Sequence, residues 1–169
     1  SGFNGGSQPY VEGDGVAEWL RDAAFSWGGT VGPLAVLVIY QNVTFAAGDI
    51  IAGYAGSSQR PWIQQLAGPT RASWEPRPSS TTILSAGTTP IMQIGTWDLS
   101  TAVNRIGDTT TSAAAAGAGY ADSAAFGLFS RADGASPANA RVAACYVCRA
   151  VPSADIQNDF RAYAAWRWG

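Results

Sequence analysis

The sequence lacks both lysine and histidine. Its ten positive charges are therefore all arginines, against twelve carboxylates in 169 residues. Without histidine there is no histidine-based catalytic triad or histidine metal site. Without lysine there is no Schiff-base lysine and no lysine-containing phosphate loop. Charged residues amount to only 13%, with a formal net charge of -2. This balance gives no attraction for phosphate backbones, so the sequence predicts no nucleic-acid partner.

Long apolar runs are absent as well. No window approaches the roughly 18 consecutive apolar residues of a membrane-spanning helix, so no membrane partner is predicted. Residues 1–7 show neither the charged region nor the apolar core of a signal peptide, which either never existed or has been removed. Apolar residues nevertheless make up 47% of the chain. This length and composition predict one folded domain with a substantial core.

Cysteine occurs only twice, as Cys145 and Cys148. Three positions apart within a predicted strand, the two side chains point to opposite faces, which disfavours a disulfide between them. A zinc site needs about four ligands, which the sequence does not offer around this pair. The sequence therefore predicts two free thiols, no metal site and no cofactor.

Residues 1–15 contain five glycines and one proline. This composition predicts a flexible or extended N-terminal arm outside the core, which would order on docking to a neighbour. The arm residues expected to make partner contacts are Phe3, Asn4, Pro9 and Tyr10. Residues 16–169 are expected to form a single domain.

Most of that domain is predicted to be β-strand. Residues 33–45 are continuously apolar and rich in β-branched side chains, as in a strand covered on both faces. Shorter strand candidates, several with alternating apolar and polar residues, are 50–54, 62–66, 71–74, 81–84, 90–98, 101–106, 124–130 and 140–148. Turn signals about every 8–12 residues predict a sandwich or barrel. Residues 109–119 are a loop or a weak edge strand, and residues 16–25 fit either helical turns or a strand.

A short helix is predicted for residues 154–169. Ser153 can cap it, and Asp155 suits the positive end of the helix dipole. An apolar stripe of Ile156, Phe160, Tyr163 and Ala164 is expected to dock on the strands. Trp166 and Trp168 are expected to be structural residues that hold the helix in place.

The last thirty residues carry a family resemblance. A strand of small apolar residues (140–148) leads through Ala-Val-Pro-Ser (150–153) to a helix that ends Ala-Tyr-Ala-Ala-Trp-Arg-Trp-Gly. This order resembles the C-terminal closure of concanavalin A-like, or laminin G-like, jelly-roll domains of bacterial and phage proteins. The resemblance covers residues 33–169 and is specific only in this closing stretch. It implies an all-β jelly-roll sandwich of two antiparallel sheets with a short C-terminal α-helix.

The fold alone does not decide the function, because proteins of this family bind sugars, cleave glycosides, mediate adhesion or decorate virus particles. The paired carboxylates of its glycosidases (a Glu-x-Asp-x-x-Glu-like pattern) are missing, and no predicted strand holds two facing carboxylates. We therefore predict no enzyme and no catalytic residue. Isolated calcium ligands are a further alternative, although solvated turn aspartates are the favoured interpretation of Asp98, Asp108, Asp122 and Asp133.

Two functions remain. The favoured one is a structural protein of a phage particle, a capsid decoration (cement) or fibre component. It would be made in the host cytoplasm and placed on the virion surface, contacting other virion proteins and forming a cyclic homo-oligomer. The alternative is an extracellular carbohydrate-binding module. That hypothesis requires exposed aromatic rings for glycans to stack on, and the candidates near turns are Trp62, Trp74 and Trp97. If these residues instead fill the core or pack between subunits, this hypothesis loses its candidates.

Overall fold

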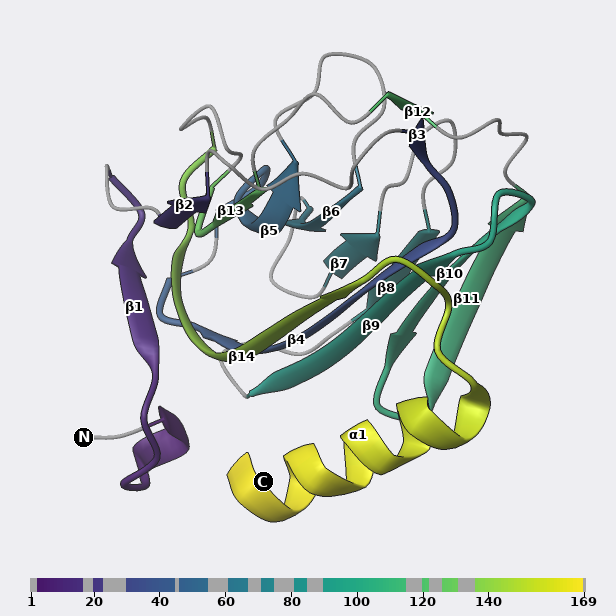
Figure 1. The fold of residues 1–169 in the computed structure, drawn as a ribbon. Coiled ribbons are helices and arrows are strands. Elements are labelled where there is room, and N and C mark those ends of the chain that lie inside the picture. The colour runs from purple at the N-terminus through teal and green to yellow at the C-terminus, as the bar shows by residue number, and fades with distance from the viewer. Residues whose placement is uncertain are drawn as a thin grey trace.

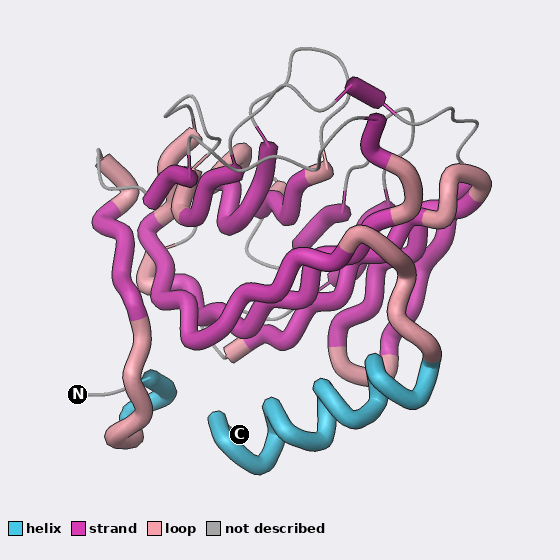
Figure 2. Tube along the Cα trace, viewed as in Figure 1, coloured by secondary structure: helices cyan, strands magenta, loops and turns pink. Residues whose placement is uncertain are grey.

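Two antiparallel sheets of six strands face one another, and one helix lies on the outside of the first sheet (Figures 1 and 2). The computed structural model describes residues 3–16, 20–22, 30–44, 46–54, 61–66, 71–74, 81–84, 90–114, 120–121, 126–130 and 136–168. The prediction of an all-β sandwich with a short C-terminal helix is thus confirmed.

Most strands lie within the predicted segments, whereas the strands Val11–Asp14, Thr30–Val31 and Tyr120–Ala121 were not predicted. The first sheet has the order β1 (Val11–Asp14), β14 (Asn139–Cys148), β4 (Leu34–Asn42), β9 (Ile91–Trp97), β10 (Thr101–Ile106) and β11 (Thr109–Ala114). The second has the order β2 (Leu20–Asp22), β13 (Phe126–Leu128), β5 (Ile50–Tyr54), β6 (Trp62–Gln65), β7 (Arg71–Trp74) and β8 (Thr81–Leu84). A small third sheet pairs β3 (Thr30–Val31) with β12 (Tyr120–Ala121).

Two ambiguous segments are resolved in part. Residues 109–114 form an edge strand, β11, and 20–22 form the edge strand β2. The rest of these two segments lies outside the described residues, at 17–19, 23–25 and 115–119. The first two residues of the strand predicted at 124–130 also lie outside them.

The strand β4 is buried on both faces, as its continuous apolar sequence predicts. Leu34, Val36, Val38 and Tyr40 point into the core between the two sheets. The alternate residues Ala35, Leu37 and Ile39 belong to clusters that also include residues of the helix. Because the helix covers the outer face, β4 has no solvated side, and it lacks the alternating pattern of a half-exposed strand.

Polar side chains also lie in the core between the sheets. Gln65 Nε2 on β6 donates to Tyr40 Oη at 3.3 Å and to Asn42 Oδ1 at 3.2 Å, both on β4. Tyr40 Oη donates to Gln93 Oε1 at 3.0 Å, and Gln93 Nε2 donates to Asn104 Oδ1 at 2.9 Å. All five residues are buried. We call Tyr40, Asn42, Gln65, Gln93 and Asn104 the polar core network.

This network joins the two sheets. Gln93 Nε2 also donates to the backbone carbonyl of Ser73 on β7 at 3.2 Å, and Asn104 Nδ2 donates to that of Thr81 on β8 at 3.4 Å. Burial raises the pKa of Tyr40 well above its usual value, so its hydroxyl stays protonated and able to donate. Buried polar groups are costly unless they are hydrogen-bonded. Each residue of the network makes at least one hydrogen bond, while Asn42 Nδ2 and Gln65 Oε1 have no partner among the described residues.

The helix α1 (Ala154–Trp168) lies across the outer face of the first sheet (Figure 1). Its start is capped as predicted, because Ser153 Oγ accepts a hydrogen bond from the Ile156 amide at 3.4 Å. The Gln157 side chain donates to the Pro152 carbonyl at 2.9 Å. In the middle of α1, Arg161 forms an ion pair with Asp108 in the turn between β10 and β11. These contacts fix where α1 begins and how it crosses the sheet.

Candidate interaction surface

The described residues contain no group of three or more His, Cys, Asp or Glu side chains that could hold a metal ion. None of the helices in the described part is long and apolar enough to cross a membrane. The polar core network contains four amides and a tyrosine, and its hydrogen bonds hold the two sheets together.

Two of the candidate calcium aspartates have structural partners. Asp98 Oδ1, in the turn between β9 and β10, accepts from the Ser100 hydroxyl at 2.8 Å and amide at 2.9 Å, and from the Thr101 amide at 2.7 Å. Mainly because of the Ser100 hydroxyl bond, the pKa of Asp98 lies below its usual value. Asp108 pairs with Arg161. Asp122 and Asp133 lie outside the described residues.

The three tryptophans expected to stack on sugars are buried. Trp74 and Trp97 are 0% exposed and Trp62 is 5% exposed. Trp74 and Trp97 belong to the core cluster between the sheets, where Trp74 Nε1 donates to the Thr96 carbonyl at 3.1 Å. The expectation of exposed rings at these positions is therefore wrong. Proximity to a turn misled it, because Trp74 and Trp97 lie at strand ends but point to the inner face that the other sheet covers.

The N-terminal segment is docked on the domain, contrary to the expectation of an arm outside the core. Phe3, in the short 3-10 helix η1 (Phe3–Gly5), is 1% exposed and packs with Ile39 of β4 and Ala164 of α1. Further along, β1 pairs with the edge of β14. A large aromatic side chain can dock a glycine-rich segment, because burying it contributes about 1.5–3 kcal/mol.

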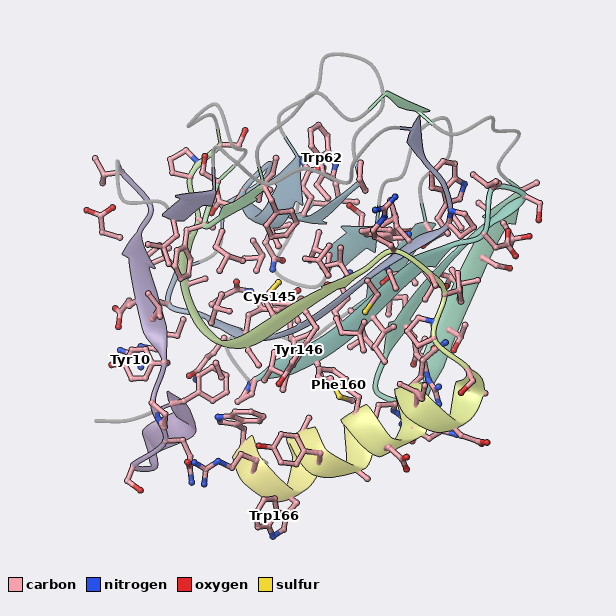
Figure 3. All side chains as sticks on the ribbon, in the orientation of Figure 1. Tyr10, Trp62, Cys145, Tyr146, Phe160 and Trp166 are labelled. Carbon is pink, nitrogen blue, oxygen red and sulfur yellow. The ribbon has the colours of Figure 1, made fainter. Side chains whose placement is uncertain are left out.

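The other predicted arm residues lie around this anchor. Tyr10 is half-buried and packs against the same cluster as Phe3, and its ring lies 5.0 Å from the guanidinium carbon of Arg141 (Figure 3). Pro9 is exposed, and Asn4 lies within η1. The structure thus brings Phe3 and Tyr10 together on one cluster, whereas Pro9 faces solvent.

The helix docks through a different stripe from the predicted one. Phe160, Ala164 and Trp168, spaced four residues apart, pack against the first sheet. Phe160 also meets Tyr146 of β14 edge to face, with ring centroids 5.6 Å apart (Figure 3). Phe160 and Ala164 were in the predicted stripe, but Ile156 is 57% exposed and Tyr163 is 46% exposed. A stripe at strict i, i+4, i+8 spacing that includes Trp168 was equally visible in the sequence.

The remaining apolar residues of α1 form an exposed surface. Trp166 is 77% exposed and points away from the sheet (Figure 3), so its predicted role in locking the helix is wrong. Its ring lies beside that of Tyr163, with centroids 5.9 Å apart, and Tyr163 meets Trp168 edge to face at 5.6 Å. We call Ile156, Tyr163 and Trp166 the α1 outer face. A single exposed leucine is ordinary, but a largely exposed tryptophan beside a half-exposed tyrosine marks a candidate binding surface.

The cysteines are free thiols, as predicted. Cys145 packs against the core between the sheets, and Cys148 packs against the cluster on the helix side, so they occupy opposite faces of β14. Burial raises the pKa of Cys145 to about 12 and also raises that of Cys148. Thiols with raised pKa values are poor nucleophiles at neutral pH, which argues for a packing role.

Comparison of the sequence with models of known protein families gives no match, and comparison with curated proteins gives none. The assignment to the concanavalin A-like family therefore stays a prediction from the C-terminal residues. The candidate surface is argued from the described geometry alone.

Proposed function

We propose that this protein is a non-enzymatic assembly component that self-associates through the α1 outer face. The observation that carries the proposal is the 77% exposure of Trp166 on a helix that is otherwise docked on its sheet. Tryptophan and tyrosine are enriched among the residues that dominate protein–protein binding energies. Burial of the exposed indole surface in an interface lowers the free energy of the complex. The net charge of only -2 leaves little electrostatic repulsion between copies.

The setting that we propose is a phage particle, where the protein would decorate the capsid or form part of a fibre, placed on the virion surface as a cyclic homo-oligomer. This part of the proposal is supported by the resemblance of the C-terminal residues to jelly-roll domains of phage and bacterial proteins. Closed cyclic symmetry is the common outcome for identical subunits that share one interface. Detection of the chain in purified particles would test this setting separately from self-association.

The first experiment is sedimentation velocity of the wild-type protein over a range of concentrations. We expect an oligomer, and Trp166→Ala is expected to weaken its association by more than about tenfold. Leu20→Ala is the matched control, because Leu20 is 50% exposed on β2, at the edge of the opposite sheet. A wild-type protein that stays monomeric at high concentration contradicts the proposal, as does equal association of the two variants.

Carbohydrate binding is the second candidate, and it now rests on the α1 outer face, because the three tryptophans first considered for it are buried. The neighbouring rings of Tyr163 and Trp166 are inclined by 41°, and an exposed pair of this kind can stack on sugar faces. A glycan array separates the two functions. Saturable binding that free sugar competes away and Trp166→Ala abolishes would favour the lectin-like function, whereas a blank array beside a concentration-dependent oligomer would favour assembly.

A further inference from the structure

Residues 3–14, which we call the N-terminal layer, run along one edge of the domain, with β1 as the outermost strand of the first sheet. The strand β1 pairs with β14 in an antiparallel register that places Val11 opposite Val142 and Asp14 opposite Asn139. Arg141 Nε on β14 donates to Glu12 Oε2 on β1 at 2.8 Å, and the same guanidinium lies over the Tyr10 ring. Beyond β1, Phe3 is buried beside the helix. The described contacts of this layer thus combine strand pairing, an ion pair and apolar packing of Phe3 and Tyr10.

The layer is joined to the rest of the described chain at a glycine. Gly15 has a φ of +76°, and a Cβ on it would lie 2.9 Å from Asn139 Cβ, so a side chain is excluded there. After this point the next strand, β2, belongs to the other sheet, where it pairs with β13. The chain therefore turns at Gly15 from β1, the edge strand of the first sheet, toward β2 in the second sheet, so an exchange of residues 3–14 needs a change of backbone direction only near this turn.

The site that this layer fills is continuous with the α1 outer face. Phe3 packs in the same cluster as Ala164 and Trp168, near the C-terminal end of α1. Trp168 contacts Tyr163, and Tyr163 contacts Trp166, so a row of aromatic rings leads from the Phe3 site to the surface proposed for self-association. Figure 1 shows η1 beside this end of the helix. A second copy that binds at the outer face therefore brings its own N-terminal layer close to the site.

We propose that residues 3–14 of one copy occupy this site on a second copy in the assembled protein, an exchange of the N-terminal strand. Every pairing described above is reproduced between the copies, so the exchange keeps these contacts and holds neighbouring copies together through them. It also keeps the β14 edge covered, which an unpaired strand edge requires to avoid uncontrolled pairing. This inference rests on the proposed self-association and names how its partner is held.

Cross-linking between positions 12 and 141 tests the exchange. The sequence contains no lysine, so Arg141→Lys places a single reactive lysine beside the Glu12 carboxylate. A water-soluble carbodiimide then joins the two side chains by an amide bond. Ordinary and heavy-isotope-labelled copies are unfolded together, refolded at high concentration, separated by size and cross-linked. Mass spectrometry of the joined peptides shows whether both come from one copy, and Glu12→Gln in the same background is the control that removes the carboxylate.

In the oligomer fraction, we expect peptide pairs with one ordinary and one heavy peptide to be as abundant as the ordinary–ordinary and heavy–heavy pairs together. In the monomer fraction, we expect only ordinary–ordinary and heavy–heavy pairs. An oligomer with only these unmixed pairs overturns the exchange and leaves the proposed self-association intact. The absence of any oligomer overturns both. Circular dichroism of Arg141→Lys checks that the variant is folded. If it does not fold, cysteines at positions 12 and 141, in a background without Cys145 and Cys148, form the same cross-link as a disulfide.

Discussion

The indole ring of Trp74, on β7 of one sheet, lies against the Cα of Gly95, on β9 of the other. A Cβ at position 95 would lie 2.7 Å from Cγ of the ring, which is far inside the usual contact distance of about 3.5–4.0 Å between carbon atoms. The hydrogen bond from Trp74 Nε1 to the Thr96 carbonyl holds the ring at this place. The sheets approach closely here because position 95 has no side chain.

Gly95→Ala is therefore expected to lower the free energy of unfolding by about 1–3 kcal/mol, since the added methyl group must displace a fully buried ring. Denaturant unfolding followed by tryptophan fluorescence measures this change. Gly32→Ala is the matched control, because a Cβ there meets nothing within 4 Å. Equal unfolding midpoints for the two variants would show that the ring and the glycine are not in contact.

Gln93→Leu should destabilise the protein by about 2–4 kcal/mol, because it leaves the buried Tyr40 hydroxyl, the Asn104 side chain and the Ser73 carbonyl each short of a hydrogen bond. Gln64→Leu is a control of the same chemistry. The Gln64 side chain is only half-buried and donates to the Gly48 carbonyl at 3.2 Å, so its replacement should cost less than about 1 kcal/mol. Comparable losses in urea unfolding of the two variants would refute a special role for the polar core network.

Ala164→Glu is expected to weaken the docking of α1 and to lower the free energy of unfolding by about 2–4 kcal/mol, because it places a carboxylate in an apolar contact with Phe3 and Ile39. The neighbouring Ala165 is exposed, so Ala165→Glu should change stability by less than about 0.5 kcal/mol. Thermal unfolding of both variants makes the comparison. Should Ala165→Glu prove the more damaging, the assignment of the docking stripe would be incorrect.

Asp98→Ala tests a pH dependence. The lowered pKa of Asp98 means that its ionised form is favoured in the folded protein. The ionised Asp98 therefore contributes to the free energy of unfolding above the unfolded-state pKa of about 4. This contribution is lost as the pH falls through the lower folded-state pKa. The carboxylate is almost fully exposed, so the loss at pH 7 should stay below about 1 kcal/mol. Wild type and variant should converge in stability in acid, and a gap that widens on acidification would contradict this assignment.

The strand positions could be predicted from the sequence because apolar periodicity depends on local neighbours. The continuous run that became β4 and the segment that became β5 are examples, and both match the structure. The capped start of α1 was also predictable, since Ser153 and Asp155 lie beside the groups that they act on. Apolar periodicity and helix capping can both be recognised without knowing which residues of the other sheet pack against a segment.

The burial of individual side chains was harder to predict, because it depends on residues distant in sequence. Nothing near Trp74 in the sequence indicates that Gly95 will lie opposite it. Likewise, nothing near Phe3 indicates that its side chain will pack between Ile39 of β4 and Ala164 of α1. Gln65 and Gln93 are polar, and period-2 patterns assign such residues to solvent, although both are buried here. The candidate surface was misassigned for the same reason, since Trp166 is distinguished from Trp168 only by which side of α1 meets the sheet.

The polar core network has a consequence for how the two sheets are aligned. Apolar side chains attract one another in many relative placements of two sheets, whereas the amides of Gln65, Gln93 and Asn104 find their partners in only one. A collapsed chain with the sheets offset by one residue would bury these amides without partners, at about 1–3 kcal/mol for each group. The network therefore favours the native alignment of the two sheets over an offset one.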